Sequence, residues 1–141
     1  MNEKMHIVTI VLTTFVALEF LYIMYLETFA TTSQRTSEVF GLSKEELSRP
    51  SLARLFQNQG VYNGLIGLLL LAALYVVPNC QCVVFLLIYC IGVAAYGGYS
   101  AGWRIFLKQG TLPLLALISC FYSKTQLIEI IKTYFNQSKS S

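Results

Sequence analysis

The chain has 141 residues, of which 55% are hydrophobic and 12% charged, and its formal net charge is +3. A soluble domain carries roughly a quarter charged residues, so this balance indicates a protein that presents apolar surface to lipid. The basic residues are scattered along the chain, which excludes the clustered charge of a nucleic-acid-binding protein. The length allows a single transmembrane domain, residues 1–141.

Four stretches are apolar enough for membrane helices, which need roughly 20 residues to cross a bilayer core of about 30 Å. They are expected over residues 5–29, 60–77, 82–103 and 105–122. The connections around Pro78 and Arg104 are short, so the last three helices are expected to be antiparallel neighbours. The predicted fold class is an all-α membrane protein, a four-helix transmembrane bundle.

The segment 30–57 is the one long polar loop. Within it, Ser43-Lys44-Glu45-Glu46 matches a capping box, which predicts a short surface helix that begins at Ser43 and ends before Pro50. A further helix start is expected at Ser48 or Ser51, leading into the second span.

The tail 123–141 places apolar residues at helical spacing opposite Glu129 and Lys132. This pattern predicts an amphipathic helix, and a separate interfacial helix is preferred over a continuation of the fourth span. With four spans, basic residues favour the long-loop side by six to four, which indicates a cytoplasmic loop in a multi-pass cell-membrane protein.

Glu19 is the most informative residue, because it lies near the middle of the first span. Insertion scales place the cost of an acidic residue at mid-bilayer at roughly 2.5 to 3.5 kcal/mol, so the carboxyl group should face the bundle, find a partner or stay protonated. Tyr22 lies three residues on and shares its helix face. The alternatives are a ligand or proton site and a hydrogen bond that only fixes packing.

Counting residues inward from the loop places Asn63 at the same depth as Glu19, so the two are expected to meet. Gln59 lies four residues before Asn63 on one face, and Asn58 lies near the entrance of the second span. Amides within a span are normally directed at other helices, either as packing contacts or as part of a site.

Glu27 lies near the exit of the first span, on the side of the membrane that also carries Arg54, Arg104, Lys108 and Gln109. These residues predict a polar vestibule open toward the long loop. Taken alone, Glu27 also fits an interfacial carboxylate paired with a basic neighbour.

Small residues indicate close helix contacts: Gly98 and Gly102 form one G-x-x-x-G motif, and Gly60 and Gly64 form another. Packing within the chain is preferred, and a homodimer through Gly98 and Gly102 is the alternative. Cys80-Gln81-Cys82 lacks further ligands, so no metal and no cofactor are expected.

Three segments together resemble a known family: Leu18-Glu19-Phe20-Leu21-Tyr22-Ile23 running into Leu26-Glu27-Thr28-Phe29, then Asn58-Gln59-Gly60-Val61-Tyr62-Asn63-Gly64, and finally Gln109-Gly110 before Pro113. The family is that of bacterial membrane proteins grouped as domain of unknown function 1304. The resemblance implies that the positions of interest are Glu19, Glu27, Asn58, Gln59, Tyr62, Asn63 and Gln109. Members usually have His after the first Glu, where this chain has Phe20.

The preferred hypothesis is a protein that binds a small molecule at an intramembrane polar pocket around Glu19 and Asn63 and transports it, with Glu19 exchanging a proton. The likeness to small multidrug exporters is an analogy of architecture. A membrane-embedded enzyme acting on a lipid or quinone-like molecule is the second hypothesis, with Glu19 or Glu27 as acid or base. A structural or accessory subunit without a site is the third.

Overall fold

The structure, a computed structural model, describes residues 5–138, with side chains from residue 5 to residue 122. All regular elements in this range are helical, which confirms the predicted fold class. They are α1 (Ile7–Met24), the π-helical turn η1 (Tyr25–Phe29), α2 (Gln34–Phe40), α3 (Lys44–Leu47), α4 (Pro50–Leu71), the π-helical turn η2 (Ala72–Val76), α5 (Cys80–Ala101) and α6 (Trp103–Ser138).

Four helices in the described part of the chain are long and apolar enough to cross a membrane: Ile7–Phe29, Pro50–Val76, Cys80–Ala101 and Trp103–Tyr122. Their outward faces carry large apolar side chains such as Phe15, Leu68, Phe85 and Ile118, each of which is more than half exposed. Soluble proteins rarely expose so much contiguous apolar surface, so this belt fits a lipid environment. The architecture is therefore compatible with a multi-pass membrane protein.

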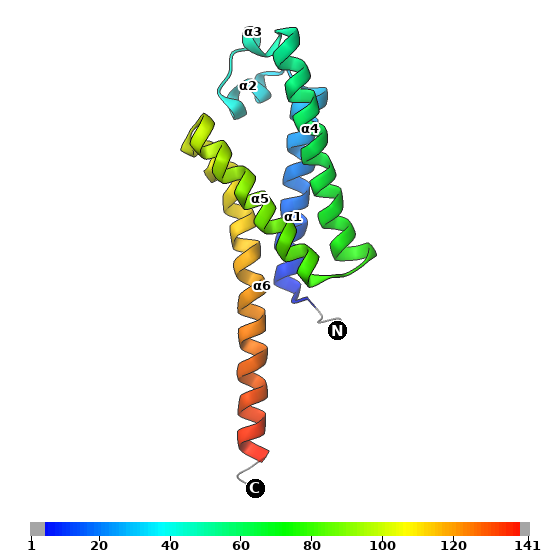
Figure 1. The fold of residues 1–141 in the computed structure, drawn as a ribbon, viewed down its shortest axis with the longest axis vertical. Helices are drawn as coiled ribbons and strands as arrows, with labels where there is room; N and C mark the ends of the chain where they lie inside the picture. Colours follow the sequence, from blue (N-terminus) through cyan, green and yellow to red (C-terminus); the bar gives the residue numbers. More distant parts are fainter. Residues whose placement is uncertain (1–4, 139–141) are drawn as a thin grey trace.

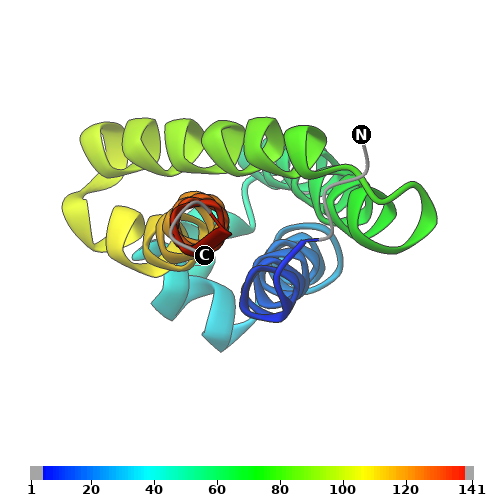
Figure 2. The same cartoon turned by 90° about the horizontal axis from the view of Figure 1, so that it is seen from below.

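The four long helices form two antiparallel hairpins, α1 with α4 and α5 with α6, joined mainly by packing of α1 against α6. Figure 1 shows α2 and α3 together at the end where α1 stops and α4 begins. Seen along the long axis, α5 lies across one side of the other helices (Figure 2). Of the predicted antiparallel neighbours, α5 and α6 pack extensively, whereas α4 contacts α5 much less than each of them contacts its hairpin partner.

The second span begins ten residues earlier than predicted, at Pro50 rather than Gly60. Proline is favoured in the first turn of a helix, because its fixed φ suits the helix and its missing N–H is not needed there. The helix start expected at Ser48 or Ser51 falls between them, at Pro50, with Arg49 as the N-cap residue. Gln57, the last residue of the predicted loop, is helical, as are the two polar residues after it.

The third and fourth spans are divided by Gly102, not by Arg104 as predicted. Gly102 has a φ of 114°, a conformation that side-chain-bearing residues rarely adopt, and it ends α5. Gly102 therefore lies in a turn instead of on a helix face, while Gly98 packs against Phe106 of α6. Dimerisation through these two glycines stays a prediction.

The C-terminal tail continues α6 through Ser138 as one helix, so the preferred separate interfacial helix is wrong. Figure 1 shows this extension running well beyond the other three long helices. The side chains that give the tail its amphipathic pattern lie outside the described range.

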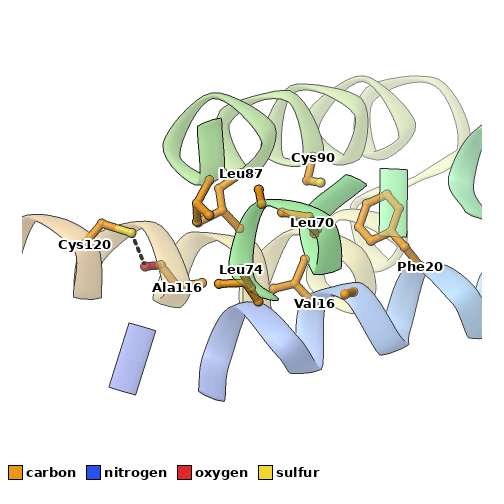
Figure 3. Packing of buried hydrophobic residues seen from close by; sticks show 11 residues of the cluster. Val16, Phe20, Leu70, Leu74, Leu87, Cys90, Ala116 and Cys120 are labelled. Atoms are coloured by element: carbon orange, nitrogen blue, oxygen red, sulfur yellow. Dashed lines mark hydrogen bonds between the residues drawn. The ribbon is translucent and has the colours of Figure 1, made fainter. Parts of the chain in front are cut away.

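A buried apolar cluster holds the two hairpins together at mid-length. Its members come from all four long helices and include Val16, Phe20, Leu70, Leu87 and Ala116, each at most 2% exposed. Figure 3 shows Phe20 and Val16 of α1 directed toward Leu70 of α4 and Leu87 of α5. Phe20, which follows Glu19 in the sequence, is therefore a core residue in this chain.

The short helices α2 and α3 form a cap over one end of the bundle. Helix α3 has the predicted capping box, in which the backbone N–H and hydroxyl of Ser43 donate to Glu46 and hold the pKa of that carboxyl group below its usual value. Helix α2 was not predicted, and it ends at Gly41, whose φ is 70°. Phe40 then packs edge-on against Phe56 of α4, with ring centroids 5.1 Å apart, which fixes the cap to the bundle.

Glycines allow α1 and α4 to approach closely. A methyl group added at Gly60 would lie 3.0 Å from the Cβ of Glu27, and one added at Gly67 would lie 2.9 Å from the backbone oxygen of Ala17. Backbone atoms within a packed pair of helices cannot move aside cheaply, so this interface depends on the missing side chains.

We expect Gly67→Ala to lower the free energy of unfolding by about 1–3 kcal/mol, because the added methyl group overpacks the interface. Thermal unfolding in a fixed detergent measures this change. Gly92→Ala is the matched control, since nothing lies within 4 Å of its added methyl group. Equal melting temperatures for the two variants would contradict the close approach.

Candidate functional site

The two carboxyl groups of the first span lie on different sides of it. Glu19 and Glu27 are eight residues apart, which on a regular helix separates them by about 80°. Glu27 lies in the π-helical turn η1 and meets α4, whereas Glu19 lies on α1 and, with residues of α2 and α6, lines a cavity. The two carboxyl groups therefore belong to two separate places in the structure.

Glu27 and Asn63 form a buried hydrogen-bonded pair between the first two long helices. Asn63 Nδ2 donates to Glu27 Oε2 across 2.7 Å, and the residues are 8% and 4% exposed, respectively. Next to them, Gly60 lets α4 come within contact of the Glu27 side chain. This enclosure matches the packing interpretation of an intramembrane carboxyl group and its amide partner.

The predicted partnership between Glu19 and Asn63 is wrong. The first two turns of α4 extend past the end of the first span, since Gln57 lies beside Thr28 and its carbonyl oxygen accepts from the Thr28 hydroxyl at 3.4 Å. Counting residues from a membrane entrance near Leu52 therefore overestimated the depth of Asn63 by about two helical turns. Its true neighbour is Glu27.

Two threonines satisfy the backbone around η1. The hydroxyl of Thr31 donates to the carbonyl oxygen of Glu27 at 2.7 Å, and that of Thr36 donates to Ala30 O at 2.6 Å and Leu26 O at 3.3 Å. A π-helical turn at the end of a span leaves carbonyl groups without regular partners, and such turns occur frequently at functional sites. Thr36 is fully buried, so it ties α2 to the end of the first span.

A cavity of about 190 Å³ lies between α1, α2 and α6. Its lining combines four apolar residues, Ile23, Leu26, Val39 and Ile105, with five polar ones, Glu19, Tyr22, Arg35, Lys108 and Gln109. For comparison, an engineered protein cavity of about 150 Å³ admits benzene. The space therefore suits a small molecule with both polar and apolar parts.

Glu19 is the deepest polar residue that the cavity-lining part of α1 contributes. Its Oε2 atom is buried and has no hydrogen-bond partner among the described residues, while the residue as a whole is half-buried. A buried polar atom without a partner is rare and costly, and it marks a position where a ligand or a proton can be bound.

On the α2 side, the cavity is lined by the cationic side chain of Arg35. Arg35 Nε donates to the Tyr22 hydroxyl at 3.3 Å, and its guanidinium also lies 3.8 Å from Glu38. The hydrogen bond to Tyr22 raises the pKa of the Arg35 guanidinium above its usual value, so this group keeps its charge at every physiological pH.

The α6 side contributes Lys108 and Gln109. Lys108 Nζ donates to the backbone oxygen of Val39 at 3.1 Å and retains further donors, because an ammonium group has three N–H bonds. Pro113 lies inside α6 and has no N–H, so the carbonyl group of Gln109 lacks its usual helical donor. At the level of Gln109 the cavity is therefore lined by an amide side chain, next to a backbone carbonyl group that lacks its i+4 N–H donor.

Helices α1 and α6 keep one antiparallel register along their contact. Ser119 Oγ donates to Thr9 Oγ1 at 3.0 Å near one end. Ten residues further along α1, and ten residues earlier in α6, Glu19 and Gln109 line the same cavity. Between these levels, Thr13 is fully buried, and its hydroxyl has no partner in the described part of the chain. Polar groups thus occur along this seam on both sides of the buried residues Val16 and Ala17.

Three of the predicted site residues lie at neither the Glu19 cavity nor the Glu27–Asn63 pair. Asn58, Gln59 and Tyr62 are exposed on α4, and Tyr62 is 63% exposed. Of the predicted set, Glu19, Tyr22 and Gln109 meet at the cavity, whereas Glu27 and Asn63 meet at the buried pair. Their ligand-binding role stays a prediction.

Several residues that shape the two sites were not singled out from the sequence. Arg35 was noted only as a loop charge, and Thr31 and Thr36 were not considered. A usable signal was Ser33, which accepts from Thr36 N at 3.1 Å as the N-cap of α2 and would have indicated a helix over this segment. That helix carries Arg35 and Val39 to the cavity.

No metal site is apparent in the described residues, where no group of three or more His, Cys, Asp or Glu side chains is suitably placed. Cys80 and Cys120 line a second cavity, of about 230 Å³, at the opposite end of the α5–α6 hairpin from Gly102. Two thiols without further ligands rarely bind a metal ion.

Comparisons with known proteins give a family but no activity. The family model described as "Protein of unknown function (DUF1304)" matches residues 14–121, which include every residue that lines the Glu19 cavity. The chain is 56% identical over 119 residues to the uncharacterized protein YpaA of Lactococcus lactis subsp. lactis (strain IL1403), with 84% of this chain and 100% of that protein covered. No solved structure matches the chain.

We expect Asn63→Ala to lower the free energy of unfolding by about 1–3 kcal/mol, because it leaves the buried Glu27 carboxyl group without its donor. Thermal unfolding of the purified protein in detergent measures the change. Asn58→Ala, which removes an exposed amide from the same helix, is the control and should shift stability little. A loss of equal size in both variants would contradict a special role for the buried pair.

Proposed function

Since the chain belongs to the DUF1304 family of proteins of unknown function, we propose its function from its own geometry: it binds a small polar molecule at Glu19 and transports it. The observation that carries this proposal is the half-buried Glu19 carboxyl group, whose Oε2 atom has no partner among the described residues, at a cavity large enough for a small ligand.

The cavity supports binding through complementary groups. Ligand pockets are mostly apolar, with a few convergent polar side chains that fix orientation, and this lining has that composition. A hydrogen-bond donor on the ligand would satisfy Glu19 Oε2, while Tyr22 and Gln109 would orient the molecule. Because a carboxyl group can release a proton as it accepts such a donor, binding would couple to proton movement.

The seam between α1 and α6 supports a route through the protein. On the far side of Val16 and Ala17 from the cavity lie Thr13, whose buried hydroxyl lacks a partner in the described range, and the Thr9–Ser119 hydrogen bond. Val16 and Ala17, both fully buried, lie between Thr13 and Glu19 on α1 and separate these polar groups from Glu19. Transport would require the α5–α6 hairpin to shift against α1 and open this apolar barrier, as in rocking-bundle transporters.

The proposal predicts Glu19-dependent proton movement in vesicles. Protein reconstituted into liposomes that contain the pH-sensitive dye pyranine is exposed to a panel of small amines, carboxylates and amino acids. At least one class should change the internal pH in the presence of wild-type protein, and Glu19→Gln should abolish that change. Because no hydrogen bond joins the Glu19 side chain to another side chain in the described part of the protein, the isosteric amide should keep the fold.

Glu45→Gln is the matched control, since it removes an exposed carboxylate from α3, away from the cavity. It should leave the response unchanged. A response that is equally large in wild type and Glu19→Gln would remove Glu19 from the mechanism, and thermal unfolding of each variant shows whether a lost response reflects unfolding.

A further inference from the structure

The cavity has charges of opposite sign at its two ends. Glu19 on α1 lies seven residues before Leu26, which is in η1 and is the lining residue nearest the end of the span. Seven residues of helix correspond to about 10 Å along the axis. The positive charges belong to Arg35 on α2 and Lys108 on α6, both of which are exposed at the loop end. The cavity is thus acidic at depth and basic at its rim.

The two cations do not neutralise Glu19. The ion pair formed by Arg35 is with Glu38, and no ion pair within 4.0 Å joins Glu19 to Arg35 or Lys108 in the described structure. Arg35 is instead held by the Tyr22 hydroxyl, and Lys108 is held by the backbone oxygen of Val39. Each cation therefore keeps donors for an anionic group that enters at the rim.

We propose that the ligand is a small zwitterion, an ω-amino acid whose ammonium group meets Glu19 and whose carboxylate meets Arg35 and Lys108. This inference rests on the proposed function, because it names the substrate class of the same cavity. The ammonium group supplies the donor that Glu19 Oε2 lacks, and the carboxylate accepts from the N–H donors of Arg35 and Lys108 that remain beside their existing contacts.

The separation of the charges favours an ω-amino acid over an α-amino acid. Glu19 lies about 10 Å along the helix axis from Leu26 at the loop end, where the rim cations lie, so a ligand that meets both needs a spacer between its charges. A few methylene groups would provide that spacer and would contact Ile23, Leu26 and Ile105 on the cavity walls.

Neither single charge satisfies the whole cavity. A simple amine would pair with Glu19 but would have to pass two cations at the rim, where like charges repel. A simple carboxylate would pair with the rim but would leave Glu19 unpartnered. Gln109, which also lines the cavity at the level of Glu19, has a side-chain carbonyl oxygen that can accept from the ammonium group there.

Three matched probes test the assignment: γ-aminobutyrate, butylamine and butyrate, which share one carbon chain and differ in their charges. Binding to the full chain in lipid nanodiscs is measured by isothermal titration calorimetry. We expect γ-aminobutyrate to bind at least about tenfold more tightly than either single-charge probe, the equivalent of one charge-assisted hydrogen bond.

Substitutions test which residues bind each end of the ligand. Glu19→Gln should remove the preference for γ-aminobutyrate over butyrate, and the double variant Arg35→Gln/Lys108→Gln should remove its preference over butylamine. Glu45→Gln should change neither preference. Retention of both preferences in both variants would overturn the placement of the ligand in this cavity.

The outcomes separate the inference from the proposed function. If butylamine or butyrate binds as tightly as γ-aminobutyrate and still depends on Glu19, the zwitterion is wrong and the Glu19 site stands. If none of the three probes binds while another class in the pyranine assay gives a Glu19-dependent response, only the zwitterion is overturned. If γ-aminobutyrate binds equally well to Glu19→Gln, both fail.

Discussion

The cost of placing a carboxyl group in an apolar layer governs how the first span is used. Its two carboxyl groups meet that cost differently: Glu27 receives a hydrogen bond from Asn63 and is sealed by α4, whereas Glu19 has a buried oxygen without a partner in the described residues. Glu27 is therefore engaged in helix packing. The Glu19 carboxyl group stays available to bind a ligand or a proton, and the proposed activity depends on that difference.

The rest of the structure maintains this separation. Glycines on α4 bring it close enough to enclose Glu27, while α2 and α6 stand on the other side of the first span and leave the cavity beside Glu19. The cap is held in place by Thr36 at the end of η1 and by the contact between Phe40 and Phe56. Because α2 carries Arg35, the same contacts that satisfy the backbone also position a rim charge.

Much of the fold could be predicted from the sequence, because the length of an apolar run is a strong signal for a membrane helix. The capping box of α3 was equally clear, since one tetrapeptide specifies it. Helix boundaries were less reliable, because polar residues such as Arg54 and Gln57 were placed in the loop although they belong to α4. The turn at Gly102 was missed, because its positive φ is a property of the backbone that a glycine permits but does not reveal.

The site was predictable only in part. The inward position of Glu19 followed from the cost of exposing it to lipid, but its neighbours depended on the register between helices, which residue spacing along one helix does not specify. An offset of two turns in α4 was enough to transfer Asn63 from Glu19 to Glu27. The antiparallel register of α1 and α6, which brings Gln109 to Glu19, likewise comes from packing and not from a local motif.

The most direct measurement is the reactivity of the two carboxyl groups toward dicyclohexylcarbodiimide, an apolar reagent that modifies carboxyl groups within membranes. In wild-type protein, intact-mass spectrometry should show one adduct in the spanning region, which peptide mapping assigns to Glu19. The adduct should be lost in Glu19→Gln and kept in Glu27→Gln. Modification of Glu27 with Glu19 unreacted would contradict the account, because it would show that Glu27 is accessible to the reagent and Glu19 is enclosed.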